Sequence, residues 1–130
     1  MANLLEGVRV IEMGTHVAVP KAARLLAEWG ADVIKVENPS PTGYGVPSED
    51  GNSPIWENEN SNKRDICLNL KNPDAMAVMH KLLADADIFL CNTRPKSLVK
   101  MGLDYDSLKK KYPRLICAYF SGFGEEGPDK

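Results

Sequence analysis

The sequence predicts an α/β fold: a Rossmann-like, doubly wound parallel sheet with helices on both faces. Short apolar runs rich in β-branched residues alternate with segments that carry apolar residues at helical spacing, which is typical of this fold class. The pattern is clearest at residues 8–37, where strand, loop, helix and strand follow one another. Such a βαβ unit places its two strands in parallel, with a right-handed connection.

The first unit begins with a strand at residues 8–13. A loop at residues 14–19 leads to a helix that starts at Pro20 and ends at Gly30, and the second strand covers residues 32–37. In open parallel sheets, ligands bind beyond the carboxyl ends of the strands. The loop at residues 14–19 is therefore the first place where a binding site is expected.

The next segment, residues 38–62, is rich in Pro, Gly, Ser and Asn and has no periodicity, so one long loop is expected. Farther along, Asn72 can cap a helix, Pro73 suits its first turn, and Gly102 can end another helix. The elements expected after the loop are a strand at 65–70, a helix from 73 to about 84, a strand at 87–92, short helices at 94–101 and about 104–111, and a strand at 115–120.

The predicted order is β-α-β-loop-β-α-β-α-α-β. No helix follows the last strand, although both faces of such a sheet are usually covered. We therefore expect residues 1–130 to be the N-terminal part of a larger protein, with the remainder of the fold and any smaller domain absent. A chain of 130 residues is still long enough to form one domain with a hydrophobic core.

Composition is that of an ordinary globular protein, with 43% hydrophobic and 26% charged residues. A net charge of −2 argues against a nucleic-acid or membrane partner. The N-terminus lacks the apolar core of a signal peptide and no apolar run could span a membrane, so a cytoplasmic location is expected. Three widely spaced cysteines indicate neither a zinc site nor a disulfide framework. Each lies in an apolar run where a buried thiol is expected: Cys67, Cys91 and Cys117.

The first loop can be compared with the fingerprint of dinucleotide-binding folds. Glu37 closes the second strand, at the position where an acidic residue would hold a ribose. The glycine pattern is missing, because the loop contains only Gly14. Without those glycines the backbone is poorly placed to approach a pyrophosphate, so an NAD-linked domain is disfavoured. The alternative for Glu37 is the polar end of a strand.

Polar and basic residues gather directly after the strand ends. Asparagine and backbone amides suit a nucleobase or an amide, whereas lysine and arginine suit phosphates. Because parallel strands end along one edge, these side chains could converge there on a phosphorylated, nucleotide-like ligand. The alternative is an ordinary solvated edge, which is polar because water covers it. The residues are Asn69 and Lys71 after the third strand, and Asn92, Thr93, Arg94, Lys96 and Lys100 after the fourth.

The residues available for catalysis form no recognisable set. His80 lies on the apolar face of a predicted helix, where a core histidine is more common than a catalytic one. His16 lies in the first loop, where a binding role stays open, and neither histidine has the spacing of a metal site. Ser121 is not set in a G-x-S-x-G turn. The residues alone therefore identify no nucleophile and no base.

Five segments, in this order, resemble the start of the class III (CaiB/BaiF-type) CoA-transferases. They are LLEGVRVIEMG, GADVIKVENP, NSNKRDICLNLK, ADIFLCNTRP and MGLDYDSLKKKYPRLICAYFSGFGEEGP, running from about Leu5 to Pro128. The long loop followed by ENSNKR is similar to the branch that acts on 2-hydroxyacyl-CoA thioesters. Carnitine CoA-transferases and an acyl-CoA racemase belong to the same family and are alternatives, as is a nucleotide-binding module without chemistry of its own.

The resemblance implies an enzyme that moves CoA from an acyl-CoA to a carboxylic acid through enzyme-bound anhydride and thioester intermediates. It also implies an interlocked homodimer, no tightly bound cofactor, and a CoA site on the Rossmann-like domain. Carried over by position, the first loop would meet CoA largely by its backbone, and the other segments would line one groove. The CoA-binding residues so implied are Val17, Ala18, Leu68, Asn69, Leu70, Lys71, Asn92, Thr93, Arg94 and Lys100.

The sequence departs from the family pattern at three points. Asn38 stands where some relatives carry an arginine, which removes one expected phosphate contact. Val17 stands where some relatives carry a glutamine, which removes a side-chain contact with the reacting acyl group. The family's nucleophilic aspartate lies beyond Lys130, so no aspartate of this chain is assigned that role.

Overall fold

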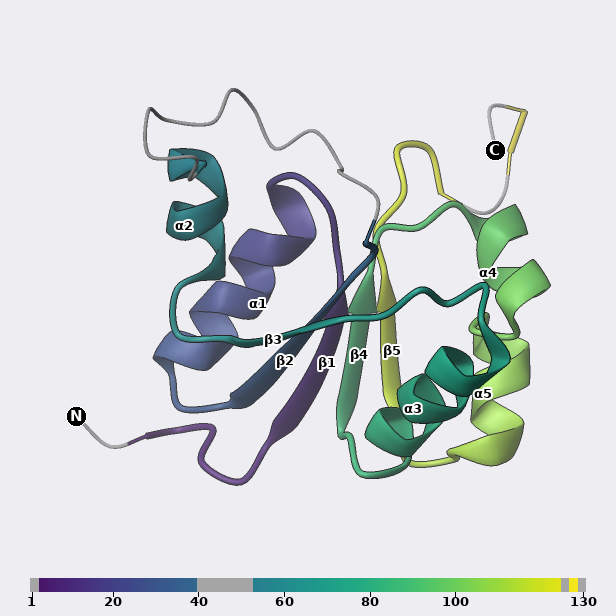
Figure 1. Cartoon of the computed structure of the whole chain (residues 1–130), viewed down its shortest axis with the longest axis horizontal. Helices are drawn as coiled ribbons and strands as arrows, with labels where there is room; N and C mark the ends of the chain where they lie inside the picture. Colours follow the sequence, from purple (N-terminus) through teal and green to yellow (C-terminus); the bar gives the residue numbers. More distant parts are fainter. Residues whose placement is uncertain (1–2, 40–52, 125–126, 129–130) are drawn as a thin grey trace.

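The computed structural model of the chain describes residues 3–39, 53–124 and 127–128. Its centre is a parallel sheet in the order β3-β2-β1-β4-β5, with helices on both faces (Figure 1). The strands are β1 (Arg9–Met13), β2 (Asp32–Glu37), β3 (Arg64–Cys67), β4 (Ile88–Cys91) and β5 (Ile116–Tyr119). The helices are α1 (Ala18–Glu28), α2 (Pro54–Asn60), α3 (Pro73–Ala84), α4 (Pro95–Met101) and α5 (Tyr105–Lys111).

The strand order reverses its direction at β1. From β1 the chain moves outward through β2 to β3, and then crosses to the other side of β1 for β4 and β5. The connections that leave β1 and β4 therefore diverge, and in doubly wound sheets ligands bind in the crevice beyond such a pair of strands. The predicted fold class, a Rossmann-like doubly wound α/β sheet, is confirmed.

Successive side chains along each strand point to opposite faces of the sheet, and each face is covered by a layer of helices. One layer is formed by α1 and α2, and the other by α3, α4 and α5 (Figure 1). The larger core lies under the second layer and includes Met79, Leu83 and Phe89, none of which is exposed. The smaller core lies under α1 and includes Val10 and Ala23. Removal of these apolar side chains from water is the main force that holds both layers on the sheet.

Local signals explain where several helices begin and end. The side chain of Asn72 caps α3 by accepting a hydrogen bond from a backbone N–H in its first turn, where Pro73 stands. Gly102 ends α4 in the left-handed conformation, with a φ of 67°. Asp104 caps α5 through the N–H of Ser107. These helix boundaries agree with the prediction because capping chemistry is local.

The prediction that residues 38–62 form one long loop is wrong in its second half. The helix α2 occupies Pro54–Asn60, and residues 40–52 lie outside the described part of the chain. Ser53 caps this helix by accepting a hydrogen bond from the N–H of Trp56, and a proline takes its first position. The start signals were in the sequence, but seven residues rich in Asn and Glu show no apolar periodicity.

Two further expectations need correction. The helix α1 begins at Ala18 rather than at Pro20, because proline is tolerated within the first turn of a helix. The third strand, expected at residues 65–70, stops pairing with β2 at Cys67. That thiol is exposed on an edge strand, so the prediction of three buried thiols is wrong for it. Cys91 is fully buried, as predicted, and Cys117 is only partly buried.

His80 is built into the packing of α3 against the end of α5. The hydroxyl of Tyr112 donates to the carbonyl of His80 at 3.0 Å and lies 3.1 Å from its Nδ1. Because the single hydroxyl proton goes to the carbonyl, Nδ1–H of the neutral imidazole donates to the tyrosine oxygen. Burial, with a smaller contribution from the Lys111 ammonium group, lowers the pKa of His80. The structure thus favours the neutral imidazole.

Acidification is therefore expected to destabilise the fold through His80. The unfolded chain takes up this proton near the ordinary pKa of about 6.5, whereas the folded chain takes it up at lower pH. Stability is thus lost as the pH falls through this interval. The midpoint of thermal unfolding should fall between about pH 7.5 and about pH 5, and it should fall less in His80→Gln. An equal fall in both proteins would contradict this.

Candidate functional site

A cleft of about 770 Å³ opens at the carboxyl edge of the sheet. The ends of β1 and β2 contribute Met13 and Val36, and the turn at residues 68–71 after β3 forms another part of the lining. Met76 of α3 and Met101 of α4 add apolar surface. The cleft thus combines apolar side chains with polar groups that stand just beyond the strand ends, as the parallel topology predicts.

The ten residues expected to bind CoA all lie within the described part of the chain. Segments distant in the sequence converge on the cleft: the turn after β3, the segment after β4, and α4. Four of the ten residues, Val17, Ala18, Asn92 and Arg94, are outside its lining. The six that line it are Leu68, Asn69, Leu70, Lys71, Thr93 and Lys100.

The first loop reaches the cleft through Gly14 and Thr15 rather than through the residues expected to contact the ligand. Val17 and Ala18 lie at the start of α1, where both are exposed. No side-chain hydrogen bond caps the helix at Val17. His16 has a φ of 61°, in the left-handed region that residues other than glycine seldom adopt. The loop therefore turns sharply between the cleft and the helix.

The side chain of Asn92 connects the two segments that diverge from β1 and β4, and its two hydrogen bonds to Thr15 are called the Asn92 clasp. Its Oδ1 accepts the backbone N–H of Thr15 at 3.0 Å, and its Nδ2 donates to the carbonyl of Thr15 at 2.9 Å. Both ends of the side-chain amide are thus used within the protein, at the crevice where the strand order reverses. Asn92 thus lies outside the lining of the cleft, and its side chain connects the two walls of the crevice.

Glu37 lines the cleft at the end of β2. A dinucleotide-binding fold would place a ribose-binding carboxylate at this position. The Oε1 of Glu37 accepts a hydrogen bond from the indole Nε1 of Trp56 at 2.9 Å and lies 3.9 Å from the ammonium nitrogen of Lys35. This carboxylate therefore joins the cleft wall to α2.

Cations reach the cleft from two directions. Lys71 follows β3, and Lys100 stands on α4; both are exposed. Arg94 and Lys96, which the sequence placed in the same group, lie at the start of α4 outside the lining, also exposed. Exposed ammonium groups can meet phosphates without losing an existing buried partner, although salt screens their attraction.

A buried group of charges, which sequence reasoning did not find, lies behind the first loop. The side chains of Glu12, Lys35 and Lys63 are each at most 1% exposed. The carboxylate accepts hydrogen bonds from both ammonium groups, at 2.9 Å and 2.8 Å. A signal was present: Glu12 and Lys35 interrupt two apolar strands at positions that pair in register. Opposite charges at such positions indicate a buried ion pair.

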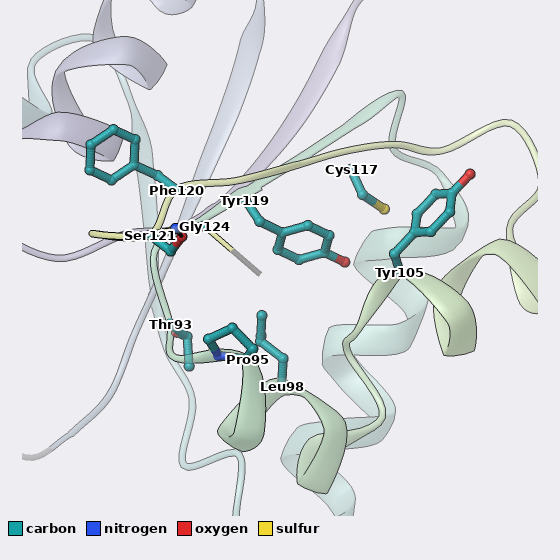
Figure 2. Close-up of a pocket in the computed structure, with 9 residues that line it drawn as sticks. All are labelled: Thr93, Pro95, Leu98, Tyr105, Cys117, Tyr119, Phe120, Ser121 and Gly124. Carbon is teal, nitrogen blue, oxygen red and sulfur yellow. Dashed lines mark hydrogen bonds between the residues drawn. The ribbon is translucent and has the colours of Figure 1, made fainter. Parts of the chain in front are cut away.

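A second hollow, of about 400 Å³, adjoins the cleft at Thr93 (Figure 2). It lies against β5, α4 and the start of α5, and Leu98 and Tyr119 are among the residues that line it. The hydroxyl of Tyr119 donates to the carbonyl of Leu103 at 3.0 Å, so it is already paired. Burial raises the pKa of Cys117, which disfavours the reactive thiolate.

In the part of the chain that the structure describes, no three or more His, Cys, Asp or Glu side chains are grouped to hold a metal ion. No helix within residues 3–39, 53–124 and 127–128 has the length and apolar character needed to cross a membrane.

The sequence model of CoA-transferase family III matches residues 5–130. The chain belongs to this family. It is 47% identical to cinnamoyl-CoA:phenyllactate CoA-transferase of Clostridium sporogenes and 43% identical to (R)-2-hydroxy-4-methylpentanoate CoA-transferase of Clostridioides difficile. Each alignment covers 98% of this chain, but 33% and 34% of the relative. The chain thus spans about a third of the length of the curated relatives that it matches.

Solved structures agree with this assignment to family III. Rv3272 of M. tuberculosis superposes with a TM-score of 0.86 at 32% identity, over 96% of this chain and 36% of that one. A CaiB/BaiF family protein of Brucella suis gives a TM-score of 0.84 at 32% identity, over 95% of this chain and 34% of that one. The resemblance read from the five sequence segments is confirmed.

Removing the Asn92 clasp should destabilise this family III fold. Asn92→Ala leaves the N–H and carbonyl of Thr15 without their partners, which should lower the free energy of unfolding by about 1–3 kcal/mol. Urea unfolding measures the change. Asn69→Ala is the matched control, because Asn69 is exposed and its side chain accepts one local hydrogen bond. Equal losses in the two variants would show that the clasp adds no stability.

Proposed function

We propose that this chain supplies the CoA-binding part of a CoA-transferase, which moves CoA between an acyl-CoA and a carboxylic acid. The observation that carries the proposal is the cleft at the carboxyl edge of the sheet, in a chain that belongs to CoA-transferase family III. The residues proposed to bind CoA, by side chain or backbone, are Val17, Ala18, Leu68, Asn69, Leu70, Lys71, Asn92, Thr93, Arg94 and Lys100.

The chemistry of the cleft suits the parts of CoA. Leu68 and Leu70 supply apolar surface against which an adenine ring can pack, and Asn69 offers an amide that can pair with a base edge. Lys71 and Lys100 supply positive charge for the pyrophosphate and the 3′-phosphate. CoA carries several phosphate charges, so more than one cation is needed to bind it.

The chain's own residues are proposed to bind and orient CoA rather than to form a covalent bond with it. Family resemblance implies an aspartate that attacks the acyl group, with release and return of CoA as thiolate. No aspartate is among the described residues that line the cleft. Burial raises the pKa of the Cys91 thiol to about 12, so it is protonated at neutral pH and is no nucleophile. The described residues therefore favour a binding task for this chain.

The finer substrate class is proposed to be 2-hydroxyacyl-CoA thioesters. Support comes from the relatives, since one is named for (R)-2-hydroxy-4-methylpentanoate and another for phenyllactate. A cytoplasmic homodimer is also proposed. Exposed apolar side chains on and after β5 support association, because such patches favour contact with another protein surface. They are Ile116, Phe120 and Phe123, at 62%, 57% and 77% exposure.

Calorimetry with CoA tests the function. The chain should bind CoA, and Lys71→Ala and Lys100→Ala should each weaken binding by about 1–3 kcal/mol, the range for losing a hydrogen bond to a charged group. For whichever lysine meets the 3′-phosphate, the loss should shrink with dephospho-CoA. Lys81→Ala, which removes an exposed lysine of α3 outside the cleft, is the control. If both cleft variants bind CoA as the parent chain does, this edge is only a solvated surface.

A further inference from the structure

The buried charges behind the first loop also hold backbone groups of that loop. The ammonium group of Lys35 donates to Glu12 and also to the carbonyl of Gly14, at 3.0 Å. The ammonium group of Lys63 donates to the other oxygen of Glu12 and to the carbonyl of Pro20, at 2.7 Å. Each lysine therefore connects the shared carboxylate to one end of the segment between Gly14 and Pro20.

The segment between Gly14 and Pro20 needs contacts with other parts of the chain to keep its backbone conformation. It contains His16 in the left-handed conformation, which persists only where the surroundings determine it. Its cleft side is fixed by the Asn92 clasp at Thr15. The two lysines fix the segment at its ends. The backbone that precedes α1 is thus anchored on both the cleft side and the interior side.

Packing at Gly14 shows how closely the loop lies on these charges. A Cβ atom at this position would stand 2.8 Å from Oε1 of Glu12 and 2.4 Å from a methyl carbon of Val19. Both distances are shorter than real contacts of a Cβ atom. A side chain at position 14 would therefore displace the carboxylate or the start of α1, so the loop lies directly against the buried charges.

Stability alone does not account for burying these groups. Removing ions from water is strongly unfavourable, and well-packed apolar side chains often stabilise a core equally well or better. Burial lowers the pKa of Lys63, and the neighbouring carboxylate of Glu12 opposes that shift. What charged groups provide and apolar groups cannot is hydrogen bonding to carbonyls at fixed positions.

The network also extends to the cleft wall. Lys63 donates to Oδ1 of Asn60 at 3.0 Å, and the Nδ2 of Asn60 donates to the carbonyl of Trp56 at 2.8 Å. The indole of Trp56 in turn holds Glu37, which lines the cleft. A chain of hydrogen bonds thus runs from the buried charges, through α2, to the ligand side.

We infer that Glu12, Lys35 and Lys63 are positioning residues for the CoA cleft, and that they set the backbone of the first loop in the conformation that receives the ligand. This inference rests on the proposed function, because the ligand is CoA. The three side chains do not line the cleft; they act through Gly14, Pro20 and the loop between them.

Replacement of the three buried ions by apolar residues separates positioning from stability. The triple variant Glu12→Leu, Lys35→Met, Lys63→Met keeps comparable side-chain size and removes all three charges, so it should still fold, with a loss of stability that comes mainly from the unpaired carbonyls of Gly14 and Pro20. It offers no donor to the carbonyls of Gly14 and Pro20. CoA should therefore bind about 10-fold more weakly, by analogy with the loss of affinity when a residue that orients a metal ligand is removed. Parental affinity in the folded triple variant would overturn the inference.

A ligand-free measurement keeps this test independent of the proposed function. Amide NMR resonances of residues 14–18 report the loop backbone directly, and they should shift in the triple variant. Unchanged resonances would overturn the inference whether or not the parent chain binds CoA. A third outcome is that the parent chain does not bind CoA but the loop resonances shift in the variant. This result would overturn the proposed function and the CoA part of the inference. It would still confirm that the network positions the loop.

Two more variants complete the design. Arg64→Met removes a cation of the same sheet that pairs with Asp32 at the amino end of β2, and it should leave both CoA affinity and the loop resonances unchanged. If the triple variant does not fold, Glu12→Gln replaces it, because this change keeps the shape of the side chain. Folded Glu12→Gln with unchanged loop resonances and CoA affinity would overturn the inference; shifted resonances with weaker binding would support it.

Discussion

Glu12 stands on β1, the central strand, and receives hydrogen bonds from the ammonium groups of Lys35 and Lys63 in a place that water does not reach. Any one of these ions left alone in the interior would be strongly destabilising, so the three must be buried together. Their joint burial fixes β2, the entry to β3 and the first turn of α1 relative to β1, at the edge where the cleft opens.

Most of the fold could be predicted because its signals are local or periodic. The β-branched runs gave β2 at its observed bounds, and the Asn72 cap placed the start of α3. The helix α2 could not be found in the same way, since its seven residues carry no periodic apolar face and the helix is held by contacts with distant segments. One such contact is the hydrogen bond from Trp56 to Glu37.

The candidate site was predictable in its place and only partly in its residues. Parallel strands must end along one edge, which brought the turn at residues 68–71 and Lys100 to one cleft. The direction of a side chain does not follow from topology. Asn92 turns its amide to the backbone of Thr15, a contact between residues 77 apart. The buried partners of Glu12 likewise depend on strand register, which one strand does not reveal.

The loop after β1 lacks the glycine fingerprint, and its backbone is held in place by other contacts. Dinucleotide-binding folds use several glycines so that the loop after β1 can approach a pyrophosphate. Here only Gly14 is present in that loop, and the neighbouring His16 is held in a left-handed conformation. The loop is anchored by ammonium groups of the interior instead. The lysines therefore divide into two sets. Lys35 and Lys63 are buried and bonded to protein partners, whereas Lys71 and Lys100 are exposed at the cleft, where we propose that they meet a phosphorylated ligand.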